Sequence, residues 1–311
     1  MASNRSRISI AANHKAGLNE VGFSGHEEQR NARDEAIERE LDRLTEASEW
    51  SPVEVNPDLY RDQLDRLEES EFSAAALDAV VRRVADEMDR TGGRFPRQNP
   101  IAWYEGFPCP ASKPWANGRW GIFWNESLFL DFVVYLCLKA RVANLSNSPE
   151  AWQRAIKEVS HIARANIRRH ELTHHSIEIA CRTAQALDPI AGQAGRPYLS
   201  PGYFGKRAFI EEILASREEM RANETNHPSV KDAAISKAIR DAYENAPRSG
   251  PYAAWRLAES PRGRLVVAKQ LAQSLGWPAA AAAVILREVD QNQDEVPEHF
   301  VNPHGLGIKL P

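Results

Sequence analysis

The stretch Arg168-Arg169-His170-Glu171-Leu172-Thr173-His174-His175 places two histidines four positions apart, with a glutamate directly after the first. In an α-helix, residues i and i+4 share one face and lie about 6 Å apart along the axis. The imidazoles of His170 and His174 can therefore reach one metal ion. Glu171 lies about 100° round the helix from His170, where its carboxylate can take a proton from a water molecule at the metal.

A long helix is expected to carry this stretch. Ser148-Pro149-Glu150 is a favourable helix start, and no Pro or Gly follows until Pro189. Residues 149–187 therefore form either one long helix or two helices with a kink. Asp188-Pro189 ends the pattern, and a loop rich in Pro and Gly leads to a further helix over residues 206–223.

The position of the two histidines on the helix has two interpretations. Ile177 and Cys181 continue the stripe of His170 and His174 at helical spacing, which predicts a partly buried face where unpaired imidazoles would be costly. In the alternative, the histidines are surface residues and Glu171 pairs with a neighbouring arginine.

A catalytic zinc requires a third protein ligand. Glu178 and His161 lie about 12 Å or more along the axis from one of the two histidines, which is too far to share the metal. The helix over residues 206–223 can return antiparallel to the motif helix, and it offers Glu211 and Glu212. Adjacent helical residues point about 100° apart, so only one of these two glutamates is expected to reach the metal.

The motif resembles that of the zincins, a family of metallopeptidases with the sequence His-Glu-x-x-His. The resemblance covers roughly residues 160–222 and implies a bound zinc ion, a mostly helical site domain with a small mixed sheet, and hydrolysis of a peptide bond. In that family His170 and His174 would be zinc ligands and Glu171 the general base.

The gluzincin branch takes its third ligand from a downstream helix, often as Glu-x-x-Ala followed by Asp or Asn. The sequence Glu212-Ile-Leu-Ala-Ser216 is similar, so the resemblance implies Glu212 rather than Glu211 as the third ligand. A second donor to the oxyanion is also usual, and Tyr203 is preferred for it over Tyr198 and His175.

The resemblance has departures. The family prefers an uncharged residue before the first histidine, where this chain has Arg169, and an apolar residue two positions after the second, where it has Ser176. The extension with Gly and a third histidine found in metzincins is absent.

The chain as a whole is predicted to be mainly α-helical, with a small β-sheet or hairpin near residues 100–125. Residues 96–125 are rich in aromatic side chains among several Pro and Gly, and the turn Asn117-Gly118 precedes a strand-like run. This sheet could serve only for packing, or its edge strand could pair with an extended substrate, as in zinc peptidases. The expected regions are a flexible tail (1–25), a helical amino-terminal region (26–95), a zincin-like core (96–225), a carboxy-terminal helical region (226–296) and an extended tail (297–311).

Composition narrows the class of protein. The chain has 311 residues, a net charge of −4 and 42% hydrophobic residues, which indicates a globular protein and gives no reason to expect a nucleic-acid partner. Its three cysteines, Cys109, Cys137 and Cys181, favour a reducing compartment over a disulfide framework. Because no secretory signal or bilayer-spanning run is visible, we expect a cytoplasmic protein without a membrane partner.

Two other functional classes remain open at this point. Arg164 and His170 fit the short Arg-x(4–6)-His motif of the all-helical HEPN ribonucleases, which act on RNA without a metal. The charged helical regions at both ends are also compatible with a non-enzymatic partner-binding protein. For the peptidase, the partner is a polypeptide substrate, either a broad set of chains or one regulatory protein.

Overall fold

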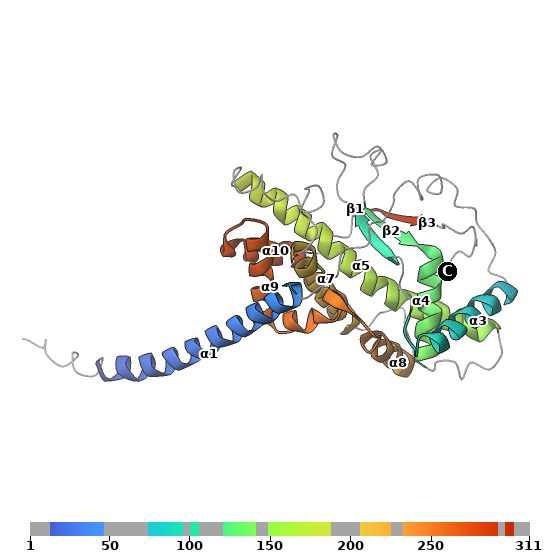
Figure 1. Ribbon diagram of the computed structural model, residues 1–311, viewed down its shortest axis with the longest axis horizontal. Helices are drawn as coiled ribbons and strands as arrows, with labels where there is room; N and C mark the ends of the chain where they lie inside the picture. The colour runs from blue at the N-terminus through green and yellow to red at the C-terminus, as the bar shows by residue number, and fades with distance from the viewer. Residues whose placement is uncertain are drawn as a thin grey trace, which may run out of the picture.

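The computed structural model describes residues 13–46, 74–95, 100–105, 121–140, 149–187, 206–224, 233–291 and 296–301. Within these residues the fold is mainly α-helical with one small three-stranded sheet (Figure 1), so the predicted fold class is confirmed. No helix in these ranges is both long enough and apolar enough to cross a membrane.

The motif lies on helix α5 (Pro149–Leu187), which runs for 39 residues as one helix. Helix α7 (Lys206–Glu224) packs along it. Asn166 of α5 bonds to Asn223 of α7, and His174 bonds to Glu211. Because the residue numbers rise along one helix and fall along the other, the two helices are antiparallel, as expected from the loop between them.

The sheet consists of β1 (Ala102–Glu105), β2 (Gly121–Asn125) and β3 (Glu298–Val301), in that order. β1 pairs antiparallel with β2, as the hairpin prediction required, and its residues 102–105 contact α5. β3 pairs parallel with β2. Part of the predicted carboxy-terminal tail is therefore a strand, which sequence periodicity could not reveal because its partner is about 175 positions earlier.

The apolar core gathers around helix α4 (Glu126–Lys139), which is buried on nearly every side. Asn125 caps this helix through its side-chain oxygen, which accepts from the Leu128 backbone N–H. Helix α3 (Ala74–Arg90) packs against α4 through an apolar stripe that includes Leu77, Val80 and Val84.

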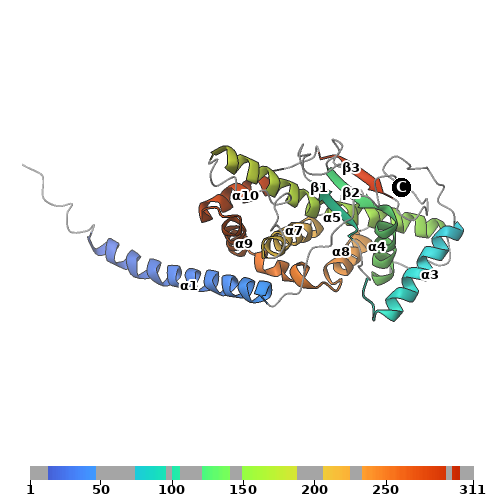
Figure 2. The same ribbon diagram turned by 45° about the horizontal axis from the view of Figure 1, so that its top comes forward.

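Helix α1 (Asn13–Glu46) extends away from the rest of the chain at its amino-terminal end (Figures 1 and 2). It starts within residues 1–25, so the expectation of a tail throughout that range needs correction. Once the helix over residues 26–46 exists, adding turns at its end costs little because each new residue gains one hydrogen bond. Leu41, fully buried, joins α1 to a core cluster formed with α7 and α9.

The predicted carboxy-terminal helical region forms short helices: α8 (Ala233–Glu244), η2 (Gly250–Tyr252), η3 (Ala254–Ala258), α9 (Pro261–Ser274), η4 (Ala279–Ala281) and α10 (Ala282–Asp290). Several of them pack directly on the motif helix pair: α10 and α8 contact α5, and α9, η2 and η3 contact α7. This region therefore shares its core with the α5–α7 pair.

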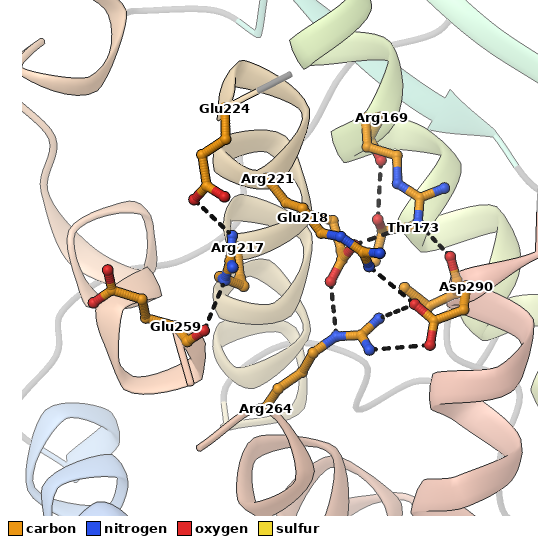
Figure 3. Close-up of polar contacts among 10 residues, drawn as sticks. Arg169, Thr173, Arg217, Glu218, Arg221, Glu224, Glu259, Arg264 and Asp290 are labelled. Atoms are coloured by element: carbon orange, nitrogen blue, oxygen red, sulfur yellow. Dashed lines mark hydrogen bonds and ion pairs between the residues drawn. The ribbon is translucent and has the colours of Figure 1, made fainter. Parts of the chain in front are cut away.

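A buried ion network joins these helices (Figure 3). Glu218 of α7, which has no exposed surface, accepts hydrogen bonds from Arg264 at 2.8 Å, Arg169 at 3.3 Å and Arg221 at 3.4 Å. Arg221 and Arg264 also bind Asp290 of α10. Arg169, the charged residue just before the first histidine, is thus a structural cation. It links α5 to α7 through Glu218 and to α10 through the Val289 carbonyl.

We expect Glu218→Gln to destabilise the metal-free protein by about 3 kcal/mol, because it removes the carboxylate partner of the mostly buried Arg169 and the more buried of the two carboxylates that bind Arg264. Chemical denaturation in the presence of a chelator measures this change. The matched control is Asp241→Asn, which breaks the exposed pair with Lys237 and should cost only about 0.3–0.5 kcal/mol. Equal effects of the two substitutions would contradict a structural role for the network.

Candidate metal centre

The structure brings together His170, His174 and Glu212, the three side chains that the sequence singled out. One ligand atom from each lies within 4.8 Å of the other two. The Glu212 carboxylate is 3.0 Å from His170 Nε2 and 3.7 Å from His174 Nε2. The two Nε2 atoms and one carboxylate therefore face a common point between α5 and α7.

The other ring nitrogen of each histidine is bound to a second carboxylate. His170 Nδ1 lies 3.0 Å from Glu219 Oε2, and His174 Nδ1 lies 2.7 Å from Glu211 Oε1. In metal sites, such partners hold the imidazole ring in one orientation and keep the proton on the nitrogen that faces away from the metal. Glu211 and Glu219 thus occupy the positions of orienting groups, while Glu212 has the position of a ligand.

The carboxylates also set the charge of the imidazoles. Burial alone would lower the pKa of His170, but its hydrogen bonds to Glu212 and Glu219 outweigh this effect and raise the pKa well above its usual value. Burial likewise opposes the charged form of His174, and the nearby charges of Glu212 and Glu211 raise its pKa. Protons and a metal ion would therefore compete for the same nitrogens.

Glu171 is buried beside this centre. Burial raises the pKa of its carboxyl to about 7, against the opposing effect of the imidazoles of His170 and His174. The charges of Glu212 and Glu219 also contribute to the increase. A carboxyl with a pKa near neutrality can both accept and release a proton at that pH.

The donor set fits zinc. Two histidines and one glutamate are a known set for catalytic zinc, and tetrahedral bonds of about 2.0–2.1 Å place ligand atoms roughly 3.4 Å apart. Glu212 Oε2 lies 3.0 Å from His170 Nε2, and Glu212 Oε1 lies 3.7 Å from His174 Nε2, so both contacts are close to this spacing.

A second polar group connects the motif helix to the sheet. Tyr104 of β1 donates its hydroxyl hydrogen to Glu178 at 2.9 Å, and the same oxygen lies 2.8 Å from His175 Nδ1. All three side chains are buried. Glu171, His175 and Glu178 are spaced i, i+4 and i+7, so β1 contacts the helix face on which the predicted general base lies.

Other residues considered from the sequence have different surroundings. Glu178 binds Tyr104 and is not part of the ligand group, as its distance along the helix predicted. Tyr203 and Tyr198 lie outside the described residues. Tyr252 of η2 was not considered, and its ring centre lies 6.1 Å from that of His170.

Sequence reasoning did not identify Glu219 or assign Glu211 its role. Glu219 could have been found, because it follows Glu212 by seven residues and therefore lies on the same face of α7, two turns further along. Tyr104 and Tyr252 carry no such signal, because their contacts with α5 join segments about 70 or more positions apart in sequence.

The arginine and histidine of the ribonuclease-like pattern contact different elements. Arg164 binds Glu298 of β3 at 2.7 Å, and its guanidinium lies 4.8 Å from the centre of the Phe300 ring. His170 instead faces α7. This arrangement does not favour joint action of Arg164 and His170 on one phosphate.

Comparison with known proteins adds no family to these observations. The chain matches no protein-family model, and neither the curated proteins nor the solved structures contain a match to it. Any functional conclusion therefore depends on the geometry of the site.

We expect zinc to stabilise the protein more strongly at pH 8 than at pH 6. The raised pKa values of His170 and His174 mean that their protonated forms stabilise the metal-free fold below about pH 6.5, and this contribution is lost as the pH rises through the raised values. For each proton that zinc displaces from an imidazole, the stabilisation of the fold by zinc increases by about 1.4 kcal/mol per unit of rising pH. Thermal unfolding with zinc and with a chelator, from pH 6 to 8, measures the difference.

His299→Gln serves as the control, since this histidine lies on β3 against Phe123 and should leave the pH dependence unchanged. In His174→Gln the zinc-dependent stabilisation should be largely lost. A zinc effect that does not vary with pH would contradict competition between protons and metal at these imidazoles.

Proposed function

We propose that this protein is a zinc-dependent peptidase, with His170, His174 and Glu212 as zinc ligands and Glu171 as the general base. One observation carries the proposal. Both Nε2 atoms face Glu212, while both Nδ1 atoms are held by other carboxylates. Two histidines without a binding role would be expected at the surface, because burying imidazoles among three glutamates is costly unless each group is paired.

Zinc, when bound, would supply Lewis-acid activation of a water molecule and of the scissile carbonyl. Glu171 takes the proton of the attacking water as the water oxygen bonds to the carbonyl carbon. It then delivers that proton to the nitrogen of the leaving amine as the C–N bond breaks. Tyr203 remains our candidate for the second donor to the oxyanion.

The sheet supports a polypeptide as the substrate. β1 is an edge strand of the described sheet and contacts the motif helix. An extended peptide can add to such an edge through main-chain hydrogen bonds, which would place its backbone beside Glu171. The buried bonds of Tyr104 to His175 and Glu178 fix the distance between this strand and the helix.

Glu171→Gln should retain zinc and lose cleavage by a factor of about 10²–10⁴, because the amide cannot accept the proton of water. Elemental analysis compares the zinc content of wild type and variant. Mass spectrometry of a peptide library compares the cleavage products that each of them generates. Glu158→Gln, about three turns earlier on the same helix, is the control. A protein that takes up no zinc would overturn the proposal. Zinc binding without cleavage of any peptide would instead favour the non-enzymatic alternative.

Tyr104→Phe should raise KM for a peptide substrate several-fold while leaving zinc affinity unchanged. The substitution removes the hydroxyl that joins β1 to α5, so the edge strand is less firmly placed, but no ligand of the metal is touched. Trp103→Phe, on the opposite face of the same strand, is the matched control. Equal KM values for Tyr104→Phe and wild type would argue against substrate binding at this edge.

A further inference from the structure

Arg248 lies behind the metal centre, in the segment between α8 and η2, and its side chain is only 9% exposed. Its Nη1 and Nη2 atoms donate to Glu219 Oε1 at 3.3 and 3.2 Å. The Tyr243 hydroxyl donates to the same oxygen. The guanidinium also lies over the Tyr243 ring, with its carbon 5.3 Å from the ring centre.

These contacts determine what the other oxygen of Glu219 can do. Three donors occupy Oε1, so Oε2 is left for His170 Nδ1, 3.0 Å away. Because the carboxylate accepts at both oxygens, Nδ1 must be the donor of that bond. In the metal-free protein Nε2 also lies 3.0 Å from a carboxylate oxygen, that of Glu212. Because Nδ1 stays bound to Glu219, Nε2 is the nitrogen that would give up its proton and offer its lone pair to a metal ion.

We propose that Arg248 is a positioning residue of the metal centre, which acts through Glu219 to fix the orientation and tautomer of His170. The inference rests on the proposed metal site but does not depend on peptide cleavage. It makes the carboxy-terminal region a part of the centre, since Arg248 and Tyr243 both come from it and the ligand comes from α5.

Arginine suits this position better than lysine. Its planar guanidinium brings two N–H groups to one carboxylate oxygen and lies over an aromatic ring at the same time, whereas an ammonium is a point charge on a flexible stem. Lysine should therefore restore the charge but only part of the geometry. This difference separates positioning of Glu219 from charge alone.

The test is zinc affinity, measured by competition with a chelating indicator in the full-length protein. Removal of an orienting partner usually weakens metal binding by about 10–100-fold, and we expect a loss in this range for Arg248→Met. Arg248→Lys should fall between Arg248→Met and wild type. Arg256→Met is the control, because that guanidinium lies over Trp255 and away from the centre. Cobalt-substituted Arg248→Met should also show shifted d–d absorption bands.

A double variant tests whether Arg248 acts through Glu219. Once Glu219→Gln has removed the orienting carboxylate, adding Arg248→Met should weaken zinc binding no further. If Arg248→Met fails to fold, Tyr243→Phe and Arg248→Lys replace it in the test. Tyr243→Phe removes the hydroxyl that donates to Oε1 and keeps an aromatic ring against the guanidinium. Arg248→Lys removes the guanidinium donors to Oε1 and keeps the positive charge. Additive losses in the double variant would overturn the inference.

The outcomes also separate this inference from the proposed function. If the wild type binds zinc and cleaves nothing, while Arg248→Met binds zinc more weakly, the peptidase proposal fails and the positioning role stands. If folded Arg248→Met binds zinc as tightly as wild type, the positioning role fails. If the wild type binds no zinc, both are overturned.

Discussion

The structure depends on one buried contact, where three glutamates of α7 meet two imidazoles of α5. Glu211, Glu212 and Glu219 lie within hydrogen-bond distance of these rings. Burying several carboxylates is costly unless each is paired, so this contact is stable only with protons or a metal on the histidines. The contact that joins the two helices therefore brings together His170, His174 and Glu212, a group that could hold a metal ion.

Polar residues occupy several buried faces of the motif helix, α5. The polar side chains on each face bind a different set of elements. His170 and His174 face the glutamates of α7, Arg169 binds Glu218 of α7 and a carbonyl of α10, and His175 binds Tyr104 of β1. Because each of these four side chains has a partner, much of their desolvation is compensated locally. The partners also restrict rotation of the helix, so the two Nε2 atoms keep their direction toward Glu212.

The buried carboxylates of α7 require partners from outside the two helices and the sheet. Cations that balance the buried carboxylates of α7 come partly from the carboxy-terminal region: Arg264 serves Glu218, and Arg248 serves Glu219. The short helices there are therefore part of the electrostatic support of the centre. Removing them would leave charged groups on α7 without partners, which is a physical reason to treat the α5–α7 pair and this region as one unit.

The sequence alone determined what is local. The spacing of His170 and His174, the uninterrupted run from Pro149 and the loop before Lys206 were enough to predict the motif helix and its antiparallel neighbour, because helical periodicity fixes which residues share a face. The preference for Glu212 over Glu211 came from a family resemblance. In the structure the two residues have different contacts: Glu212 lies near both Nε2 atoms, and Glu211 binds His174 Nδ1. Only the tertiary structure decided which side chains support the ligands. Arg248 and Tyr104 reach the motif helix and its partners through contacts between distant segments, and no local pattern encodes which distant residues will pack together.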